Sequence, residues 1–224
     1  MGHRRRPRRP NLTSVARRRT AVAWIRRLLV ALGLALCVFA GLGALALRVF
    51  ADDCPPQGDG GDRDLNKLKN RAETPRSAVT MAVRDLVRMR SVRTRRNRAR
   101  WTREQSRSIG EIEGAAVRVE GYVVSVREEG AEAANCHGDG HDLHVTLSEA
   151  LGGRDLVVVE ITPRMRKSSW TTAAVRALLR RRVRVTGWLM YDQEHAPGDS
   201  RSTSWEVHPV TGVEVFAEGS WRDL

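Results

Sequence analysis

Side chains capable of metal-binding or acid–base chemistry gather in the second half of the chain, between residues 136 and 208. Imidazole, thiolate and carboxylate groups are ligands that Zn²⁺ accepts. Asp142 and His144 alternate along an expected strand, so both side chains project from one face, about 7 Å apart. The candidate metal ligands are Cys136, Asp142, His144 and His208, and Zn²⁺ is the ion that suits such a set.

The same residues also allow an interpretation without metal. The run Cys136-His137-x3-His141-x2-His144 matches no standard zinc-finger spacing. Histidines scattered over a glycine-rich loop are more often ordinary polar residues. A catalytic use stays open as well, in which Glu160 acts as a general base on a phosphodiester or related bond beside a bound ion. The sequence therefore leaves both an enzyme and a binding protein open.

The elements that position these residues follow from the hydrophobic pattern. Stretches rich in β-branched residues, most of them with period-2 alternation, predict strands at 115–126, 142–148, 156–162, 183–190 and 205–216. A helix is expected at 169–179, between the third and fourth strands. A mainly β, five-stranded Greek-key barrel with one helix in that place is the oligonucleotide/oligosaccharide-binding (OB) fold.

Several motifs in this half of the chain carry a family resemblance. They are VRVEGYVVSV, NCH followed by DLH, VVVEITPR, VRVTGWLMYDQEH and SWEVHPVTGVEV. On these motifs the chain resembles an uncharacterised group of exported bacterial proteins expected to carry the OB fold. The resemblance covers roughly half the chain. It supports the fold, but the group has no established activity to transfer.

Strand alternation assigns the candidate binding residues to one face. Leu143, Val145 and Leu147 face the barrel interior, so the polar residues between them face outward. OB folds bind ligands on the outer face of their second and third strands and at the adjoining loops. The candidate ligand-binding residues, expected to be exposed to solvent, are His144, Thr146, Glu160, Trp188, His195 and His208. The alternative for Glu160 is a structural ion pair with Arg164, Arg184 or a histidine.

Charge is distributed very unevenly along the chain. The 224 residues carry a formal net charge of +13, but residues 1–48, 49–62, 63–107 and 108–224 carry +11, −4, +11 and −5. The basic character therefore lies outside the predicted barrel at 108–224. A nucleic-acid surface needs clustered bases, so the negative barrel argues against generic binding to a phosphate backbone.

A membrane anchor is expected near the start. Residues 28–47 form an uncharged apolar run of 20 residues, enough to cross the hydrocarbon core as a helix. Arginines crowd its amino side, so the positive-inside rule places residues 1–27 in the cytoplasm and the chain beyond the 28–48 anchor outside. The expected location is the plasma (inner) membrane, with a single pass through the lipid bilayer. Cleavage as a signal peptide is the alternative, and would give a secreted protein.

The segments between the anchor and the barrel differ in composition. Residues 49–62, rich in Gly, Pro and Asp, predict a solvated spacer. Within 63–107, apolar residues after Pro75 recur at helical spacing and predict an amphipathic helix, followed by an arginine-rich stretch. This arm could contact an anionic surface or polymer, or could simply be a solvated tether. Export permits a disulfide between Cys54 and Cys136, while a free or metal-bound Cys136 is the alternative.

These observations favour a membrane-anchored, exported OB-fold binding module. A saccharide, a peptide or a protein partner fits the charge of the barrel better than nucleic acid does. The alternatives are a metal-dependent hydrolase and a structural partner of another envelope protein. No cofactor is assured beyond the candidate divalent metal.

Overall fold

The computed structural model describes residues 54–138, 140–198 and 200–224. The predicted cytoplasmic segment and membrane helix lie outside the described residues. Within the described ranges, no helix is both long and apolar enough to cross a membrane. Cys54–Leu224 form one compact unit, so the predicted arm packs together with the barrel.

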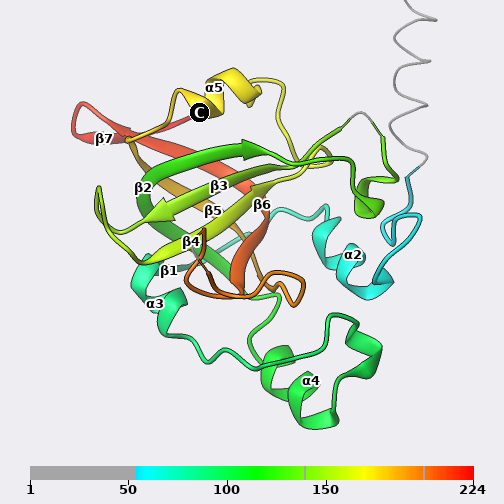
Figure 1. Cartoon of the computed structure of the whole chain (residues 1–224). Coiled ribbons are helices and arrows are strands. Elements are labelled where there is room, and N and C mark those ends of the chain that lie inside the picture. Colours follow the sequence, from blue (N-terminus) through cyan, green and yellow to red (C-terminus); the bar gives the residue numbers. More distant parts are fainter. Residues whose placement is uncertain (1–53, 139, 199) are drawn as a thin grey trace, which may run out of the picture. The chain divides into compact units, whose positions relative to one another are not determined.

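Five strands close into a barrel, as predicted (Figure 1). They are β2 (Ala116–Glu128), β3 (Leu143–Ser148), β4 (Leu156–Ile161), β5 (Arg182–Tyr191) and β6 (Trp205–Ala217). The strand order is β2-β3-β4-β6-β5, and β2 pairs back with β5. The contact between β4 and β6 is parallel and consists of the pair Val159 and Val207. The helix α5 (Thr172–Arg176) lies between β4 and β5. This topology is that of the OB fold.

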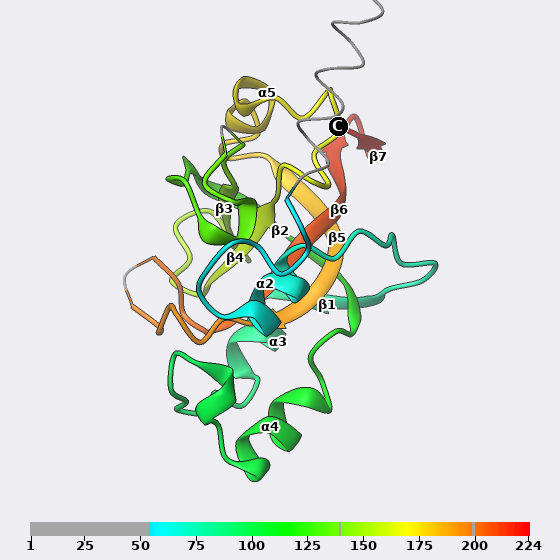
Figure 2. The ribbon, with the colours of Figure 1, turned by 90° about the vertical axis from the view of Figure 1, so that its right-hand side faces the viewer.

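Alternating apolar residues fill the barrel interior as the pattern predicts. The inward-facing side chains of β3 and β4 are at most 3% exposed and belong to one hydrophobic core: Leu143, Val145, Leu147, Val157, Val159 and Ile161. The chain around α5 adds Trp170 and Val175 to this core, at one end of the barrel (Figures 1 and 2). Fully burying one such side chain contributes about 1.5–3 kcal/mol, so the core dominates the stability of the barrel.

The predicted amphipathic helix after Pro75 is partly wrong. Val79–Ala82 form a short strand, β1, which pairs in parallel with Val117–Glu120 of β2, and the helix α3 covers only Val83–Arg88. On this edge of β2, β3 pairs only from residue 122 onward, so the preceding backbone groups are available to another strand. That pairing overrides the helical spacing and leaves Val79 66% exposed.

Part of the arginine-rich stretch contacts the barrel through hydrogen bonds of Arg98. It contains the short 3-10 helix η1 (Arg98–Arg100) and the helix α4 (Arg103–Gly110). The guanidinium group of Arg98 donates to both carboxylate oxygens of Glu113, at 2.6 and 2.7 Å, and to the backbone oxygen of Tyr191. The strand β7 (Ser220–Asp223), which the sequence did not predict, pairs with the end of β6.

The segment 54–70 is also tied to the barrel domain. Cys54 and Cys136 form a disulfide, which joins this segment to the loop between β2 and β3. The helix α2 (Arg63–Lys69) follows, and the side chain of Asn70 donates to the backbone oxygen of Ala134, within η2 (Ala133–Asn135), at 2.6 Å. Residues 54–62, whose composition suggests a solvated spacer, are thus held beside the β2–β3 loop.

A substitution at Gly187 on β5 can test how closely β5 and β6 pack. A Cβ atom there would lie 2.5 Å from the backbone oxygen of Pro209, whereas at Gly212 the nearest atom is 3.5 Å away. We expect Gly187→Ala to lower the free energy of unfolding by about 1–3 kcal/mol through overpacking. The control Gly212→Ala should change it by no more than about 1 kcal/mol. Thermal melts of the two variants beside the wild type measure this, and equal effects would contradict the packing described.

Candidate functional site

Charged side chains on the outer face of the barrel are buried, not exposed to solvent. Glu160 on β4 is 2% exposed, and His144 on β3 is 5% exposed. The alternation that turns them away from the barrel interior is confirmed, but the expected exposure to solvent is wrong. The reason is that Lys69 of α2 and Arg201 of the loop between β5 and β6 cover this face. Arg201 pairs with Asp192 and Glu206, while Lys69 pairs with Glu132 of the β2–β3 loop. We call the buried set the ionic cluster; it comprises Lys69, Asp142, His144, Glu160, Asp192, Arg201, Glu206 and His208.

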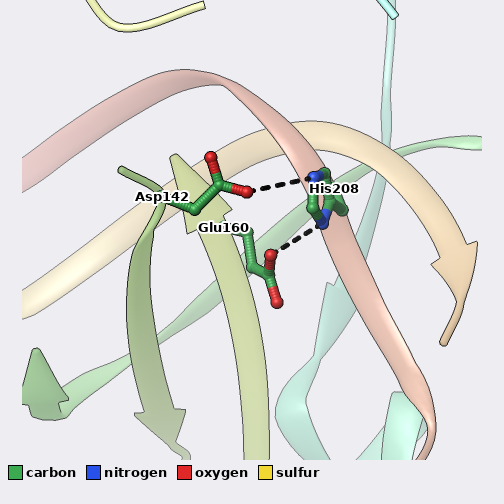
Figure 3. A group of neighbouring side chains, drawn as sticks. All are labelled: Asp142, Glu160 and His208. Carbon is green, nitrogen blue, oxygen red and sulfur yellow. Dashed lines mark ion pairs between the residues drawn. The ribbon is translucent and has the colours of Figure 1, made fainter. Parts of the chain in front are cut away.

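His208 lies at the centre of the ionic cluster, between carboxylates on either side of its ring (Figure 3). Its Nδ1 atom is 2.9 Å from Glu160 Oε2 and 3.1 Å from Glu206 Oε1. Its Nε2 atom faces Asp142 Oδ2 at 4.0 Å. The other oxygen of Asp142 accepts a hydrogen bond from the Asn135 side chain at 3.0 Å. The ring is thus fixed through Nδ1, while Nε2 has no hydrogen-bond partner among the described residues.

Glu160 has histidine partners, which was one of the pairings expected for it. Its Oε1 atom lies 2.8 Å from His144 Nε2, in addition to the contact with His208. The two arginines that were also considered pair elsewhere: Arg164 with Asn70, and Arg184 with Glu214. The strand register explains the first contact, because His144 and Glu160 are directly opposite each other in the β3–β4 pair.

The ionic cluster contains more buried negative charge than fixed positive charge. Its four carboxylates are at most 2% exposed: Asp142, Glu160, Asp192 and Glu206. Arg201 donates to Asp192 at 3.0 Å and to Glu206 at 2.9 Å, and Lys69 supplies the second cation that does not depend on pH. Lys69 itself pairs with Glu132, outside the four. Burial of unbalanced charge is costly, so the negative charge that remains must be met by protonated histidines or by another cation.

The surroundings shift the pKa values of the cluster in opposite directions. Burial raises the pKa of Asp142 to about 6, against the opposing charge of His208. Burial alone would lower the pKa of His208, but the negative charge of Glu160 and the contact with Glu206 raise it to about 10. Burial also disfavours ionised Glu160, yet the charge of His208 holds the pKa of Glu160 well below its usual value. Glu160 is therefore an ionised partner of the histidines at neutral pH, unsuited to act as a general base.

A groove opens beside the cluster, at the face where OB folds bind ligands. It has a volume of about 350 Å³ and lies over β2, β3 and β4, bordered by the β5–β6 loop. Three of the predicted ligand-binding residues line it: His144, Thr146 and His195. The remaining lining residues that carry polar side chains are Ser125, Arg127, Glu194, Ser200 and Arg201.

The other predicted ligand-binding residues lie elsewhere. Glu160 and His208 are buried and do not line the groove. Trp188 contacts the arm before the barrel: its indole N–H donates to the backbone oxygen of Glu73, and the Arg71 guanidinium lies 3.3 Å from its ring centre. The structure therefore brings together only part of the predicted set in one groove.

The predicted metal ligands are also partly brought together. Asp142 and His208 share one buried group with Glu160, in which the ligand atoms all lie within 4.8 Å of one another. Cys136 is engaged in the disulfide and offers no thiolate, so its assignment as a metal ligand is wrong. His144 contacts Glu160 and Glu129 and lies outside that group.

Sequence reasoning missed the two buried cations. Lys69 lies in an arm that the composition assigns to solvent, and Arg201 is one arginine among many. The sequence did contain a signal for Lys69. The chain has only three lysines among its 39 basic residues, and two of them are Lys67 and Lys69. The helical spacing of α2 turns Lys69 inward and leaves Lys67 outside.

Comparison with known proteins identifies no family for this chain. No protein-family model matches the sequence, and no curated protein matches it. Asparaginyl-tRNA synthetase from Pyrococcus horikoshii is similar over 49% of this chain and 22% of its own, with 17% identity and a TM-score of 0.35. The OBody AM1L10 bound to hen egg-white lysozyme is similar over 57% of this chain and 100% of its own, with 15% identity and a TM-score of 0.33.

RecG bound to a three-way DNA junction is a third similar structure. The match covers 69% of this chain and 15% of RecG, with 16% identity and a TM-score of 0.36. This chain therefore spans about a fifth or less of the length of the synthetase and of RecG. The assignment of the OB fold rests on the strand order and the position of α5.

Two lysines of α2 provide a matched test of the ionic cluster. The side chain of Lys69 is 8% exposed and pairs with Glu132 at 3.3 Å, whereas that of Lys67 is 57% exposed and pairs with Asp64. Lys69→Met should lower the free energy of unfolding by about 3–5 kcal/mol, because buried carboxylates lose a cation. Lys67→Met should change it by less than about 1 kcal/mol. Chemical denaturation of both variants measures the difference, and a small effect at Lys69 would contradict the charge balance described.

His195 makes stability depend on pH. Its Nδ1 atom lies 2.6 Å from Asp192 Oδ2, and this hydrogen bond raises the pKa of His195 above its usual value. A raised folded-state pKa stabilises the protein fully below about pH 6.5, and this contribution is lost as the pH rises through the folded-state pKa. We therefore expect His195→Gln to lower the melting temperature more at about pH 5.5 than at about pH 8.5. The same decrease at both pH values would rule out the charged pair.

Proposed function

We propose that this chain is a binding module whose OB barrel holds a carboxylate-bearing ligand in the groove over β2, β3 and β4. The observation that carries the proposal is the position of the groove. It lies on the barrel face and beside the β5–β6 loop that OB folds use for ligands. Its volume of about 350 Å³ falls within the range of small-ligand sites, roughly 300–1,000 Å³.

The side chains of the groove favour an acidic ligand. Arg127 and Arg201 line it, and the pKa of both His144 and His195 is raised. Glu194 is the acidic residue in the lining. A guanidinium group binds a carboxylate through two parallel hydrogen bonds. The side chain of Arg127 pairs with Glu129 through Nε and is 62% exposed, so its terminal nitrogens are accessible to a ligand. An acidic peptide or an acidic saccharide suits these groups.

The burial of the acid–base residues favours a binding function over catalysis. Asp142, Glu160 and His208 are each at most 2% exposed. A general base must come within hydrogen-bond distance of the proton that it removes. A substrate in the groove would meet His144 and His195, and would be separated from the three buried residues.

We place this module outside the cell membrane. The disulfide between Cys54 and Cys136 supports an oxidising compartment. The predicted membrane helix at 28–48 and the arginines before it would leave the barrel on the extracytoplasmic side. Exposed arginines of the 63–107 arm, such as Arg95 and Arg96, would then face anionic polymers or lipid head groups near the membrane.

The carboxylate preference can be tested with paired probes. The full chain is presented to short peptides and oligosaccharides, each as the free carboxylate and as the matching amide. We expect binding of carboxylate forms and little binding of amides. Arg127→Gln should weaken binding about tenfold or more, because a charge-assisted pair is lost.

Arg222 provides the control for this experiment. It lies on β7, away from the groove lining, and forms an exposed pair with Glu218. Arg222→Gln should leave the affinity unchanged. Equal losses in the two variants, or equal binding of carboxylates and amides, would contradict the proposed recognition.

A further inference from the structure

A second cavity borders the loop between β5 and β6, and the chain segment 91–94, which follows α3, forms another of its walls. Its volume is about 360 Å³. It is distinct from the groove over β2, β3 and β4, because Ala196 is the one described residue that lines both. We propose that this second cavity binds the phosphate group of a phosphate ester. The inference does not rest on the carboxylate binding proposed for the groove.

The described side chains that line the second cavity offer hydrogen-bond donors and no carboxylate. The polar ones are Ser91, Arg93, Thr94, Tyr191, Gln193 and Ser204. Phosphate oxygens bound by proteins accept hydrogen bonds from arginine, hydroxyl and amide side chains and from backbone N–H groups. A phosphate monoester presents three strong acceptor oxygens and a charge of about −1.5 to −2, so a lining of donors without an acid suits it. The groove differs, since Glu194 lines it.

The donors on the 91–94 side of the cavity are the ones open to a ligand. The hydroxyl groups of Tyr191 and Ser204 already donate to backbone oxygens. Ser91 and Arg93 are exposed and Thr94 is half-buried, so their side chains can turn toward a molecule in the cavity. One guanidinium group and two hydroxyl groups from a single short segment therefore surround the proposed phosphate position.

The backbone of this segment is held by its carbonyl groups, which leaves its N–H groups free. Four side chains donate to these carbonyl oxygens: Trp205 to residue 90, Tyr191 to residue 92, Gln105 to residue 93 and Trp101 to residue 95. The backbone N–H groups of residues 91–94 have no hydrogen-bond partner among the described residues. They add to the donors available to phosphate oxygens at the cavity that these residues line.

Gln193 supplies an independent sign of a missing acceptor. Its side chain lines the cavity and is 9% exposed. The amide oxygen accepts a hydrogen bond from Arg98 Nε at 3.2 Å, which fixes the orientation of the amide. The amide nitrogen is buried and has no partner within the described part of the chain. Buried polar groups are normally hydrogen-bonded, so an oxygen atom of a ligand in the cavity would complete this side chain.

Positive charge surrounds the cavity on the side of the arm. Residues 90–103 contain seven arginines and no acid. Arg98 pairs with Glu113, and the other six are exposed: Arg90, Arg93, Arg95, Arg96, Arg100 and Arg103. Such a field raises the local concentration of any anion, and most strongly of a multiply charged one. Selection of phosphate must therefore come from Arg93 and the other donors that line the cavity.

The experiment uses the full chain in mild detergent and phosphate-free buffer at constant ionic strength. Calorimetric titrations compare glycerol 3-phosphate, which is a monoester, glycerophosphoglycerol, which is a diester, and uncharged glycerol. We expect an ester to bind and glycerol to give no signal, and excess acetate should not displace the ester. Binding of either ester supports the proposal, and the stronger of the two shows whether the site takes a terminal phosphate or a phosphate that links two groups.

Arg93→Gln should weaken binding of the ester at least about tenfold, because a charge-assisted pair is lost. Arg103→Gln is the matched control, since it removes the same charge from an exposed residue of the same stretch that does not line the cavity. It should leave the affinity within about twofold. Arg93→Gln should also leave carboxylate binding in the groove unchanged, so the two proposed sites can fail separately.

Hydrogen exchange of the wild type gives a readout that depends on no variant. The amides of residues 91–94 have no hydrogen-bond partner among the described residues and should exchange rapidly in the free protein. We expect the bound ester, but not glycerol, to slow their exchange. The proposal would be overturned by a folded wild type that binds neither ester, by equal losses in Arg93→Gln and Arg103→Gln, or by unchanged exchange at residues 91–94 when an ester is bound.

Discussion

Neutralisation of buried charge on the outer face of the barrel is the constraint on which the rest of the structure depends. Four carboxylates lie there with almost no exposure to water, on β4 and β6 and beside the ends of β3 and β5. Carboxylates at such depth are tolerated only with cations close by. Lys69 and Arg201 come from segments outside the barrel strands, so the covering segments and the charged face depend on each other. Without the covering segments the buried carboxylates would lose nearby cations, and without the carboxylates the buried Lys69 and Arg201 would lose nearby anions.

The covering segments also explain how a small barrel makes a defined groove. The disulfide from Cys54 and the hydrogen bonds of Asn70 fix the chain before α2 to the β2–β3 loop. The β5–β6 loop is held by Arg201 and by the contact between His195 and Asp192. The groove lies between strands and a loop that are each anchored by charge, so its lining is positioned before any ligand arrives.

Much of the barrel could be predicted from the sequence, because period-2 alternation reports directly which side chains face a core. The strand positions, the helix between the third and fourth strands and the inward residues such as Val145 and Val159 were all predicted correctly. The environment of the outward residues could not be predicted in this way. His144 and Glu160 face outward as expected, but what covers them lies some 75 or more residues away along the chain, at Lys69. Local pattern carries no information about such a contact. The strand β1 escaped prediction for a related reason, since its pairing depends on the edge that β2 offers.

The pairing between β4 and β6 gives the ionic cluster a further consequence. The backbones of these two strands meet at one residue pair, Val159 and Val207, whereas the other barrel strands share longer ladders. Glu160 and His208 are the next residues along the two strands, and their side chains meet at 2.9 Å. Side-chain charge thus reinforces the barrel at the seam where the backbone ladder is shortest. The barrel should therefore open first between β4 and β6 when the protonation of His208 changes, because that change weakens its pairing with Glu160.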